Sequence, residues 1–295
     1  QHGIVLRLDI IFVQIELHSS KNPGPVFVDF RSFRRLWAFV TSITHTIVIG
    51  VGLIGGSLAR ALRESGYCRT VVGAGRNPEN LRHAVELGVI DSYETDPARA
   101  VAAADMVLVA VPLGAMEPVF RAIRGHLAAG AVLTDAGSAK VSVIEAMRRA
   151  CGEVPANFVP GHPIAGIEQS GVAASLPDLY RNRRVILTPL PDTAAAAHAQ
   201  VRHMWEAAGA VVDEMDPAHH DVVLAATSHL PHVLAFTLVE SLARLGDSDE
   251  IFRYAAGGFR DFTRIASSDP VMWRDVFLSN REATLDILGR FTEEL

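Results

Sequence analysis

The sequence predicts a doubly wound α/β fold with a mostly parallel sheet, followed by an all-α C-terminal domain. A β-branched run, Ile47–Ile49, leads into a glycine-rich turn and then into a segment of helical periodicity. Apolar strand-like runs alternate with helical runs up to residue 215, and beyond Asp216 the pattern is helical throughout. Buried strands that alternate with helices are typical of parallel sheets covered by helices on both faces.

The turn Gly50–Gly55 has the G-x-G-x-x-G spacing of a Rossmann-type fold. In this spacing Gly50 permits a tight turn, Gly52 lets a pyrophosphate approach the backbone, and Gly55 lets the helix pack against the strand. Free amides at the helix start favour phosphate. Such turns also occur in α/β proteins that bind no nucleotide, but the flanking strand and helix favour dinucleotide binding. The expected contact residues are Gly50, Gly52, Leu53, Ile54 and Gly55.

The end of the next predicted strand, 70–74, bears on which nicotinamide is used. An NAD-specific fold usually places Asp or Glu about 20 residues past the glycines, where it binds the ribose 2′-hydroxyl. Here Gly75 occupies that position, and Arg76 follows with a charge suited to a 2′-phosphate. The alternative is that Arg76 points to solvent and NAD binds through the glycine turn alone. The sequence favours NADP over NAD.

Composition narrows the classes of partner. A chain of 295 residues with 49% hydrophobic residues can bury the cores of two domains. A net charge of -6 without a Lys/Arg block argues against nucleic acid and against an anionic membrane surface, so we expect a small-molecule substrate. Cys68 and Cys151 lack the spacing of a disulfide framework or a zinc site, which indicates a reducing compartment, the cytoplasm.

Residues 1–45 receive no assignment and are treated as an N-terminal extension. The apolar run Ile4–Leu17 is interrupted by charges, is too short to span a membrane, and lacks the features of a signal peptide. Residues 46–215 are predicted to form the dinucleotide-binding domain and residues 216–295 a helical substrate and dimerisation domain. These two domains use up the chain, so we expect any regulatory ligand to compete in the substrate pocket.

Beyond the first helix, the expected elements alternate along the chain. The expected strands are 70–74, 106–111, 131–134, 158–159, 185–188 and 210–212, and the expected helices are 78–87, 116–127, 141–150 and 193–208. The long apolar-rich helical pattern 218–245 carries more apolar surface than a small bundle hides. We therefore expect a homodimer that covers part of it.

Chemically suggestive residues gather in four stretches. The first two follow predicted strands, where a parallel sheet presents ligands, and the other two lie in the helical domain. The stretches are Asp135–Lys140; Gly161–Gly166 with Glu168 behind it; Ser228–His232; and Gly257–Arg264 with Trp273 beyond it.

Together with the glycine turn, these stretches resemble the prephenate and arogenate dehydrogenases of tyrosine biosynthesis. The segments D-x-G-S-x-K, GHPIAG-x-E, SHLPH and GGF-x-DFTRIA-x-SDP-x-MW occur in the order of that family. The resemblance covers about residues 46–295. The second and fourth segments are specific, because other hydroxyacid dehydrogenases share only the glycine turn and the general sheet.

The resemblance implies a reaction and assigns roles in it. Oxidation of the ring hydroxyl by hydride loss to a nicotinamide leaves a ketone that sheds CO2, and aromatisation drives the reaction. By this resemblance His162 polarises the hydroxyl, which suits an imidazole with a pKa near 6.5. Ser138 would orient His162 and the hydroxyl, and Arg264 would bind a substrate carboxylate, a task suited to a planar guanidinium.

Further site residues follow from the same resemblance. By this resemblance His232 would stand at the mouth of the site, and Glu168 is the glutamate that follows GHPIAG. Gly257 would make a backbone contact, and Trp273 would form an aromatic wall. Arg260 stands where the family often has lysine, which preserves the positive charge. Ile167 stands where a small polar residue is frequent next to the substrate, which leaves the choice between prephenate and arogenate open.

Taken singly, each of these residues also has a structural interpretation. His162 and Trp273 could belong to the core, and Arg264 could be a solvated helix charge. Ser138 could be a helix N-cap. The positive charge of Lys140 in the first turn of that helix would then be slightly unfavourable, and a cofactor phosphate would relieve it. The His and Asp residues of 216–232 mix helix faces, and hydride transfer needs no metal, so we expect none. Two other functions remain open: another hydroxyacid or imine oxidoreductase, and a nucleotide-sensing module without turnover.

Overall fold

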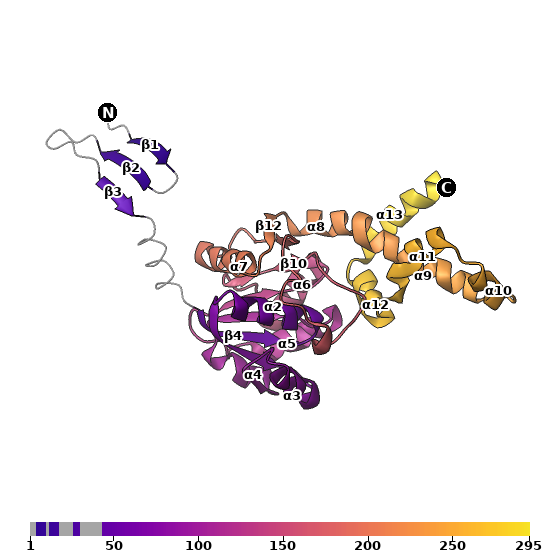
Figure 1. Cartoon of the computed structure of the whole chain (residues 1–295), viewed down its shortest axis with the longest axis horizontal. Coiled ribbons are helices and arrows are strands. Elements are labelled where there is room, and N and C mark those ends of the chain that lie inside the picture. Colours follow the sequence, from indigo (N-terminus) through magenta and orange to yellow (C-terminus); the bar gives the residue numbers. More distant parts are fainter. Residues whose placement is uncertain (1–3, 10–11, 18–25, 30–42) are drawn as a thin grey trace. The chain divides into compact units, whose positions relative to one another are not determined.

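The computed structural model describes residues 4–9, 12–17, 26–29 and 43–295, in two units divided between Ile43 and Thr44. The first unit contains an antiparallel sheet in the order β1-β2-β3, a feature that sequence reasoning left unassigned (Figure 1). Its strands are β1 (Ile4–Asp9), β2 (Phe12–Leu17) and β3 (Val26–Asp29). In β2 apolar residues recur at every second position, which is the period of a strand with one apolar face.

The second unit is built on a six-stranded sheet in the order β6-β5-β4-β7-β8-β9. Its strands are β4 (Ile43–Ile49), β5 (Cys68–Ala74), β6 (Ser92–Glu94), β7 (Met106–Val109), β8 (Val132–Asp135) and β9 (Phe158–Val159). The pairings β5–β6, β4–β7, β7–β8 and β8–β9 are all parallel, which confirms the predicted Rossmann-type fold. The strand order reverses direction at β4, and ligands bind at such switch points.

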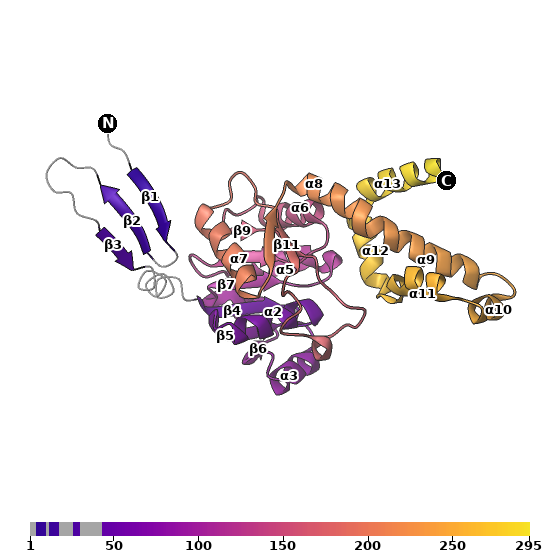
Figure 2. The same cartoon turned by 45° about the horizontal axis from the view of Figure 1, so that its top comes forward.

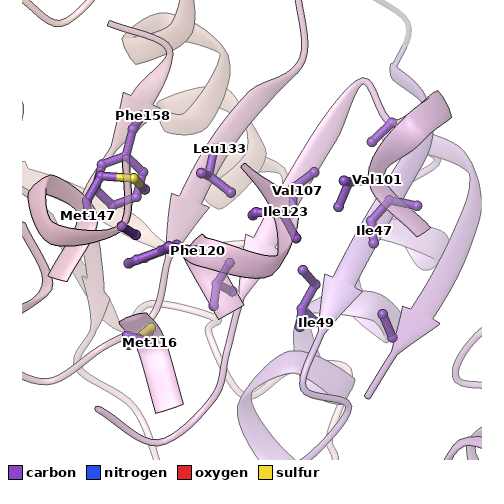
Figure 3. Close-up of a cluster of buried hydrophobic side chains, with 14 of the residues drawn as sticks. Ile47, Ile49, Val101, Val107, Met116, Phe120, Ile123, Leu133, Met147 and Phe158 are labelled. Carbon is purple, nitrogen blue, oxygen red and sulfur yellow. The ribbon is translucent and has the colours of Figure 1, made fainter. Parts of the chain in front are cut away.

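Helices cover this sheet and close its core. They are α2 (Leu53–Glu64), α3 (Pro78–Glu86), α4 (Pro97–Ala100), α5 (Met116–Ile123), α6 (Lys140–Cys151) and α7 (Ala195–Ala207). Figure 3 shows side chains of β4, β7, β8 and β9 meeting those of α5 and α6 in one buried cluster, including Phe120, Phe158 and Met147. This packing fixes the carboxyl ends of the strands, where the site lies.

A second sheet departs from the sequence expectation. It has the order β10-β11-β12, from β10 (Gly161–Pro163), β11 (Arg184–Leu187) and β12 (Val211–Glu214). β10 is antiparallel to β11, whereas β11 and β12 are parallel. The sequence expectation ended the strand at residue 159 and placed Gly161–Gly166 after it, but His162 is the middle residue of a further strand, β10. Pro160 separates β9 from β10, and because proline has no amide to donate, the chain leaves the first sheet there.

The remaining chain is helical, as predicted. A rod of 27 residues comprises α8 (Pro217–Leu224), a π-helical turn (Ala225–His229) and α9 (Leu230–Ala243). Shorter helices lie beside it, namely α10 (Ser248–Arg253), α11 (Gly257–Thr263), α12 (Pro270–Ser279) and α13 (Arg281–Glu294) (Figure 2). By length and composition the rod could cross a membrane, yet only 22% of its most apolar window is buried, which leaves an apolar face exposed in one chain.

Candidate active site

The glycine turn has the geometry that a dinucleotide needs. Gly50 has φ +96°, and a Cβ there would lie 2.3 Å from the carbonyl oxygen of Ala110. A Cβ on Gly55 would lie 2.3 Å from the Gly50 oxygen, whereas one on Gly52 would meet no atom within 4 Å. α2 begins at Leu53 with neither a side-chain cap nor an acidic residue in its first turn. The open space over Gly52 and the uncapped helix start fit a pyrophosphate.

Gly75 and Arg76 lie beside this turn. The Gly50 amide donates to the Ala74 oxygen at 2.8 Å, which holds the end of β5 against the turn. A Cβ on Gly75 would approach only Leu81, at 3.8 Å, so the position has room for a larger group. Arg76 is exposed and forms no ion pair with any residue that the structure describes. The two residues therefore lie at the end of β5, next to the glycine turn.

The D-x-G-S-x-K segment forms a buried ion pair instead of a phosphate contact. The Lys140 Nζ donates to Asp135 Oδ2 at 2.5 Å and to the Gly161 oxygen at 2.6 Å, and both charged side chains have no exposed area. Asp135 also accepts from the amides of Gly161, at 3.1 Å, and Gly137, at 2.7 Å. Burial lowers the pKa of Lys140, and Asp135 opposes that shift. The idea that a cofactor phosphate relieves Lys140 is thus wrong, since the pair instead anchors β10.

His162 faces the helical domain from this anchored strand. Its side chain is buried, with 9% of the residue exposed, and its Nδ1 lies 2.9 Å from Nε2 of His220 on α8. The Nδ1 of His220 lies 2.8 Å from Oδ1 of the adjacent Asp221. Burial first, and then the proximity of His220 and Lys140, lower the pKa of His162 well below 6.5. Near neutral pH the ring is therefore uncharged and can accept a proton.

Asp221 joins three parts of the chain at this point. Its carboxylate accepts from the amides of Lys140, at 2.7 Å, and Val141, at 3.0 Å, and so caps the start of α6. Its backbone oxygen accepts from Nδ2 of Asn280 at 2.7 Å, and the same amide nitrogen lies 3.1 Å from Nδ1 of His229. Sequence reasoning considered His220, Asp221 and His229 only as metal ligands and did not consider Asn280. His220 and Asp221 had as their signal a His-Asp pair one turn into a helix, His229 lay in the SHLPH segment without a role of its own, and Asn280 had no signal.

Ser138 does not have the contacts expected of it. The residue is half-buried, and its hydroxyl makes no hydrogen bond with any described residue. Ala139 holds the N-cap position of α6, so Ser138 is not the helix cap either. Within the described chain, the hydrogen-bond partner of the His162 ring is His220. The orienting role of Ser138 stays a prediction.

The predicted substrate contacts of the helical domain form two groups. Arg264 forms an ion pair with Glu168, although both side chains are largely exposed. His232 stacks on Trp273 with ring centroids 3.5 Å apart, and its Nδ1 lies 2.8 Å from the Ser228 oxygen. Trp273 is 8% exposed and its Nε1 has no hydrogen-bond partner in the described chain. Burial lowers the pKa of His232, so this ring too favours its neutral form.

Gly257 and Arg260 lie on α11, the helix that leads to Arg264, and both are exposed. Ile167, next to Glu168, is 39% exposed. Among the residues that the structure describes, no group of three His, Cys, Asp or Glu side chains is arranged to hold a metal ion.

Two family models match the chain. The nucleotide-binding domain of prephenate dehydrogenase matches residues 58–214, and the dimerization domain of prephenate dehydrogenase matches residues 216–295. The chain is 40% identical over 261 residues to the cyclohexadienyl dehydrogenase of Zymomonas mobilis, covering 87% of each sequence. It is 35% identical over 256 residues to the prephenate dehydrogenase of Bacillus subtilis, covering 84% of this chain and 67% of that one.

Solved structures of prephenate and arogenate dehydrogenases are also similar to this chain. The chain superposes on the prephenate dehydrogenase of Aquifex aeolicus in complex with hydroxyphenyl propionate and NAD+, with TM-score 0.80, 38% identity and coverage of 86% of this chain and 88% of that one. For the arogenate dehydrogenase of Synechocystis the TM-score is 0.71 at 28% identity, covering 85% of this chain and 89% of that one.

Proposed function

Because this chain belongs to the prephenate and arogenate dehydrogenase family, the family predicted from its motifs, we propose how its residues perform that chemistry. The protein is an NAD(P)-dependent oxidoreductase of tyrosine biosynthesis. We propose His162 as the group that accepts the proton of the ring hydroxyl. The observation that carries this role is a buried, uncharged imidazole whose Nδ1 is engaged by His220, which leaves Nε2 as the second ring nitrogen for the substrate.

A nicotinamide cofactor held at the turn Gly50–Gly55 would supply the hydride acceptor. As the hydride leaves the ring carbon, the hydroxyl O–H bond breaks and its proton passes to His162, so the oxygen becomes a ketone oxygen. Loss of CO2 then makes the ring aromatic. A neutral base is needed at the start of this step, and the lowered pKa of His162 provides it near neutral pH. Ser138, half-buried in the separate segment Asp135–Lys140, is proposed to orient the hydroxyl.

We propose that a substrate carboxylate binds to Arg264 and displaces the carboxylate of Glu168. The support is that Arg264 already pairs with a carboxylate of its own chain, that of Glu168, and a substrate carboxylate could replace it. Arg260 adds a second positive charge on the same helix. Stacked His232 and Trp273 are proposed as the wall of the pocket, with Gly257 as a backbone contact.

The decisive experiment is an assay with prephenate and arogenate, each with NAD and with NADP, on the parent and on His162→Asn. Loss of the base is expected to lower turnover by roughly 10²–10⁴-fold while nicotinamide binding survives. Turnover of His162→Asn within about threefold of the parent at saturating substrate would remove His162 from the mechanism. The same assay ranks the two substrates, a choice on which Ile167 is expected to bear.

For the cofactor we propose a preference for NADP. The support is the exposed Arg76 beside a position, Gly75, that has no carboxylate and has room for a phosphate. Arg76→Ala should weaken NADP selectively, and Gly75→Asp should weaken NADP by charge repulsion while sparing NAD. A parent efficiency at least tenfold higher with NAD, or an equal effect of Arg76→Ala on both cofactors, would refute the role of Arg76.

We also propose a cytoplasmic homodimer assembled through residues 216–295. The exposed apolar face of the rod α8–α9 supports this assembly, because such a surface is normally covered. An open groove of about 570 Å³ along α9, lined by residues such as Phe236 and Val239, lies on this face. Both cysteines are free, which agrees with a reducing compartment.

A further inference from the structure

We propose that His220 and Asp221 are positioning residues that hold His162 in the tautomer with hydrogen on Nδ1 and a lone pair on Nε2. The proposal rests on the proposed role of His162 and adds a reason for it. A neutral imidazole can accept a hydroxyl proton only at the nitrogen that carries no hydrogen, so a base that faces substrate with the wrong nitrogen is inactive. The structure contains a chain of contacts that removes this ambiguity.

The direction of the hydrogen bonds from His162 through His220 follows from the group at which they end, the Asp221 carboxylate. The Asp221 oxygens face the backbone amides of Lys140 and Val141, and amides can only donate. Asp221 is therefore an acceptor, and the His220 Nδ1, 2.8 Å from Oδ1, must donate to it. A neutral imidazole has one N–H, so the His220 Nε2 carries the lone pair.

The same reasoning passes to the next ring. The His220 Nε2 lies 2.9 Å from Nδ1 of His162, and one of these two nitrogens must supply the hydrogen. Since the His220 Nε2 is the acceptor, the hydrogen sits on Nδ1 of His162. His162 is then left with a bare Nε2, the form that its proposed function requires.

The surroundings keep His220 neutral, on which this direction depends. His220 has no exposed area, and burial lowers its pKa, with Lys140 acting in the same direction and Asp221 and Asp135 opposing it. His229, the other histidine in this region, has its pKa lowered to about 4 by burial, so it adds no positive charge near neutral pH. A doubly protonated His220 would instead donate from Nε2 to Nδ1 of His162, which would force the hydrogen of the neutral His162 ring onto Nε2.

The arrangement also serves the charged form of the base. When Nε2 of His162 gains the hydroxyl proton, the ring becomes an imidazolium whose Nδ1–H still donates to His220. His220 in turn donates to the Asp221 carboxylate, so the new charge is stabilised through two hydrogen bonds without any further proton transfer. The proton on Nε2 leaves to solvent after the product departs.

The most direct test is ¹⁵N NMR of the ring nitrogens in the substrate-free protein at neutral pH, with the His162 signals assigned by their loss in His162→Asn. The expected spectrum has a protonated Nδ1 and a bare Nε2 for His162. The opposite tautomer, or a rapid mixture of the two, would overturn the proposal. Because no turnover is measured, this result does not depend on whether His162 is the catalytic base, and the activity of His162→Asn decides that separately.

Two substitutions then test the relay by function. His220→Leu removes the acceptor, whereas His220→Gln places an amide oxygen near the position of Nε2. We expect His220→Leu to lower kcat by about 10–100-fold, part of the roughly 10²–10⁴-fold that a positioned base contributes, with KM for substrate changed less than about twofold. His220→Gln should recover most of the loss and keep the tautomer.

The matched control is His219→Leu, because His219 is the adjacent residue on α8 but is exposed. It should leave kcat unchanged. Equal losses in His220→Leu and His220→Gln, or a kcat of His220→Leu within about threefold of the parent, would show that His220 is merely core. If His220→Leu does not fold, the parent spectrum and His220→Gln decide the question.

Discussion

Replacing Lys140 by Met should destabilise the protein strongly, although Lys140 is not proposed to touch substrate. The change removes a buried ammonium that binds Asp135 and the Gly161 oxygen at 2.5 and 2.6 Å. Asp135 would keep its two backbone amide donors but lose its opposite charge inside the protein. Methionine fills a similar volume, so the effect reports on charge and hydrogen bonding more than on packing.

The magnitude follows from the burial of both partners. Removing one member of a fully buried pair typically costs about 3–5 kcal/mol, because it leaves an uncompensated charge. For a chain of this size about 1 kcal/mol shifts the melting temperature by roughly 2–4 °C, so we expect a fall of about 6–20 °C. Circular dichroism at fixed protein concentration measures it, which keeps any contribution from dimerisation constant.

The same helix offers a control. Arg148 forms a 2.5 Å pair with Glu145, but these side chains are 50% and 46% exposed. An exposed pair of this kind contributes only about 0.3–0.5 kcal/mol, so Arg148→Met should shift the melting temperature by about 2 °C or less. A similar small shift for Lys140→Met and Arg148→Met would refute the reasoning that the Asp135 pair anchors β10.

Three further outcomes are expected. Arg264→Ala should raise KM by about 10–150-fold with little change in kcat, since a hydrogen bond to a charged group contributes about 1.5–3 kcal/mol. An unchanged KM in steady-state kinetics would show that Arg264 is a solvated charge. Burial lowers the pKa of His229 from 6.5 to about 4, so the contribution of neutral His229 to stability is complete above pH 6.5 and is lost as the pH falls toward 4. In urea titrations at several pH values, His229→Gln should therefore reduce the fall in the free energy of unfolding between pH 6.5 and 4. Phe236→Glu should give a monomer by light scattering, whereas Glu240→Gln, at an exposed residue of the same helix, should leave the dimer intact. A stable active monomer of the parent protein at micromolar concentration would contradict the proposed dimer.

The parts of the fold that sequence could predict are those determined by neighbours in the chain. The turn at Gly50–Gly55 is readable because its strand, its glycine spacing and its helix follow one another directly in the chain. The central strands β4, β7, β8 and β9 of the large sheet are readable because their apolar runs are largely buried, whereas the edge strand β6, Ser92–Glu94, is mostly exposed and was missed. β10 was missed because three residues between Pro160 and a loop carry no period, and only β11 gives them a partner.

The missed site residues have partners far away in the sequence. His162 and His220 are 58 positions apart, and Lys140 and Asp221 are 81 apart. Lysine is among the residues least often fully buried, so nothing local indicates that Lys140 lies in the interior beside Asp135. Ser138 was selected through family resemblance alone, and the structure gives its hydroxyl no partner within the described chain.

These long-range contacts make the catalytic base depend on how the helical domain is docked. Asp221 caps α6 of the α/β domain and also holds His220, so one side chain attaches α8 and sets the ring that His162 contacts. Hydrogen bonds to a charged group contribute about 1.5–3 kcal/mol each, enough to keep this end of the rod in place. The other end, α9, carries the apolar face proposed to meet a partner, and the π-helical turn lies between them. A shift of α8 by the length of one hydrogen bond would separate His220 from His162, so the docking that assembles the two domains is also what prepares the base.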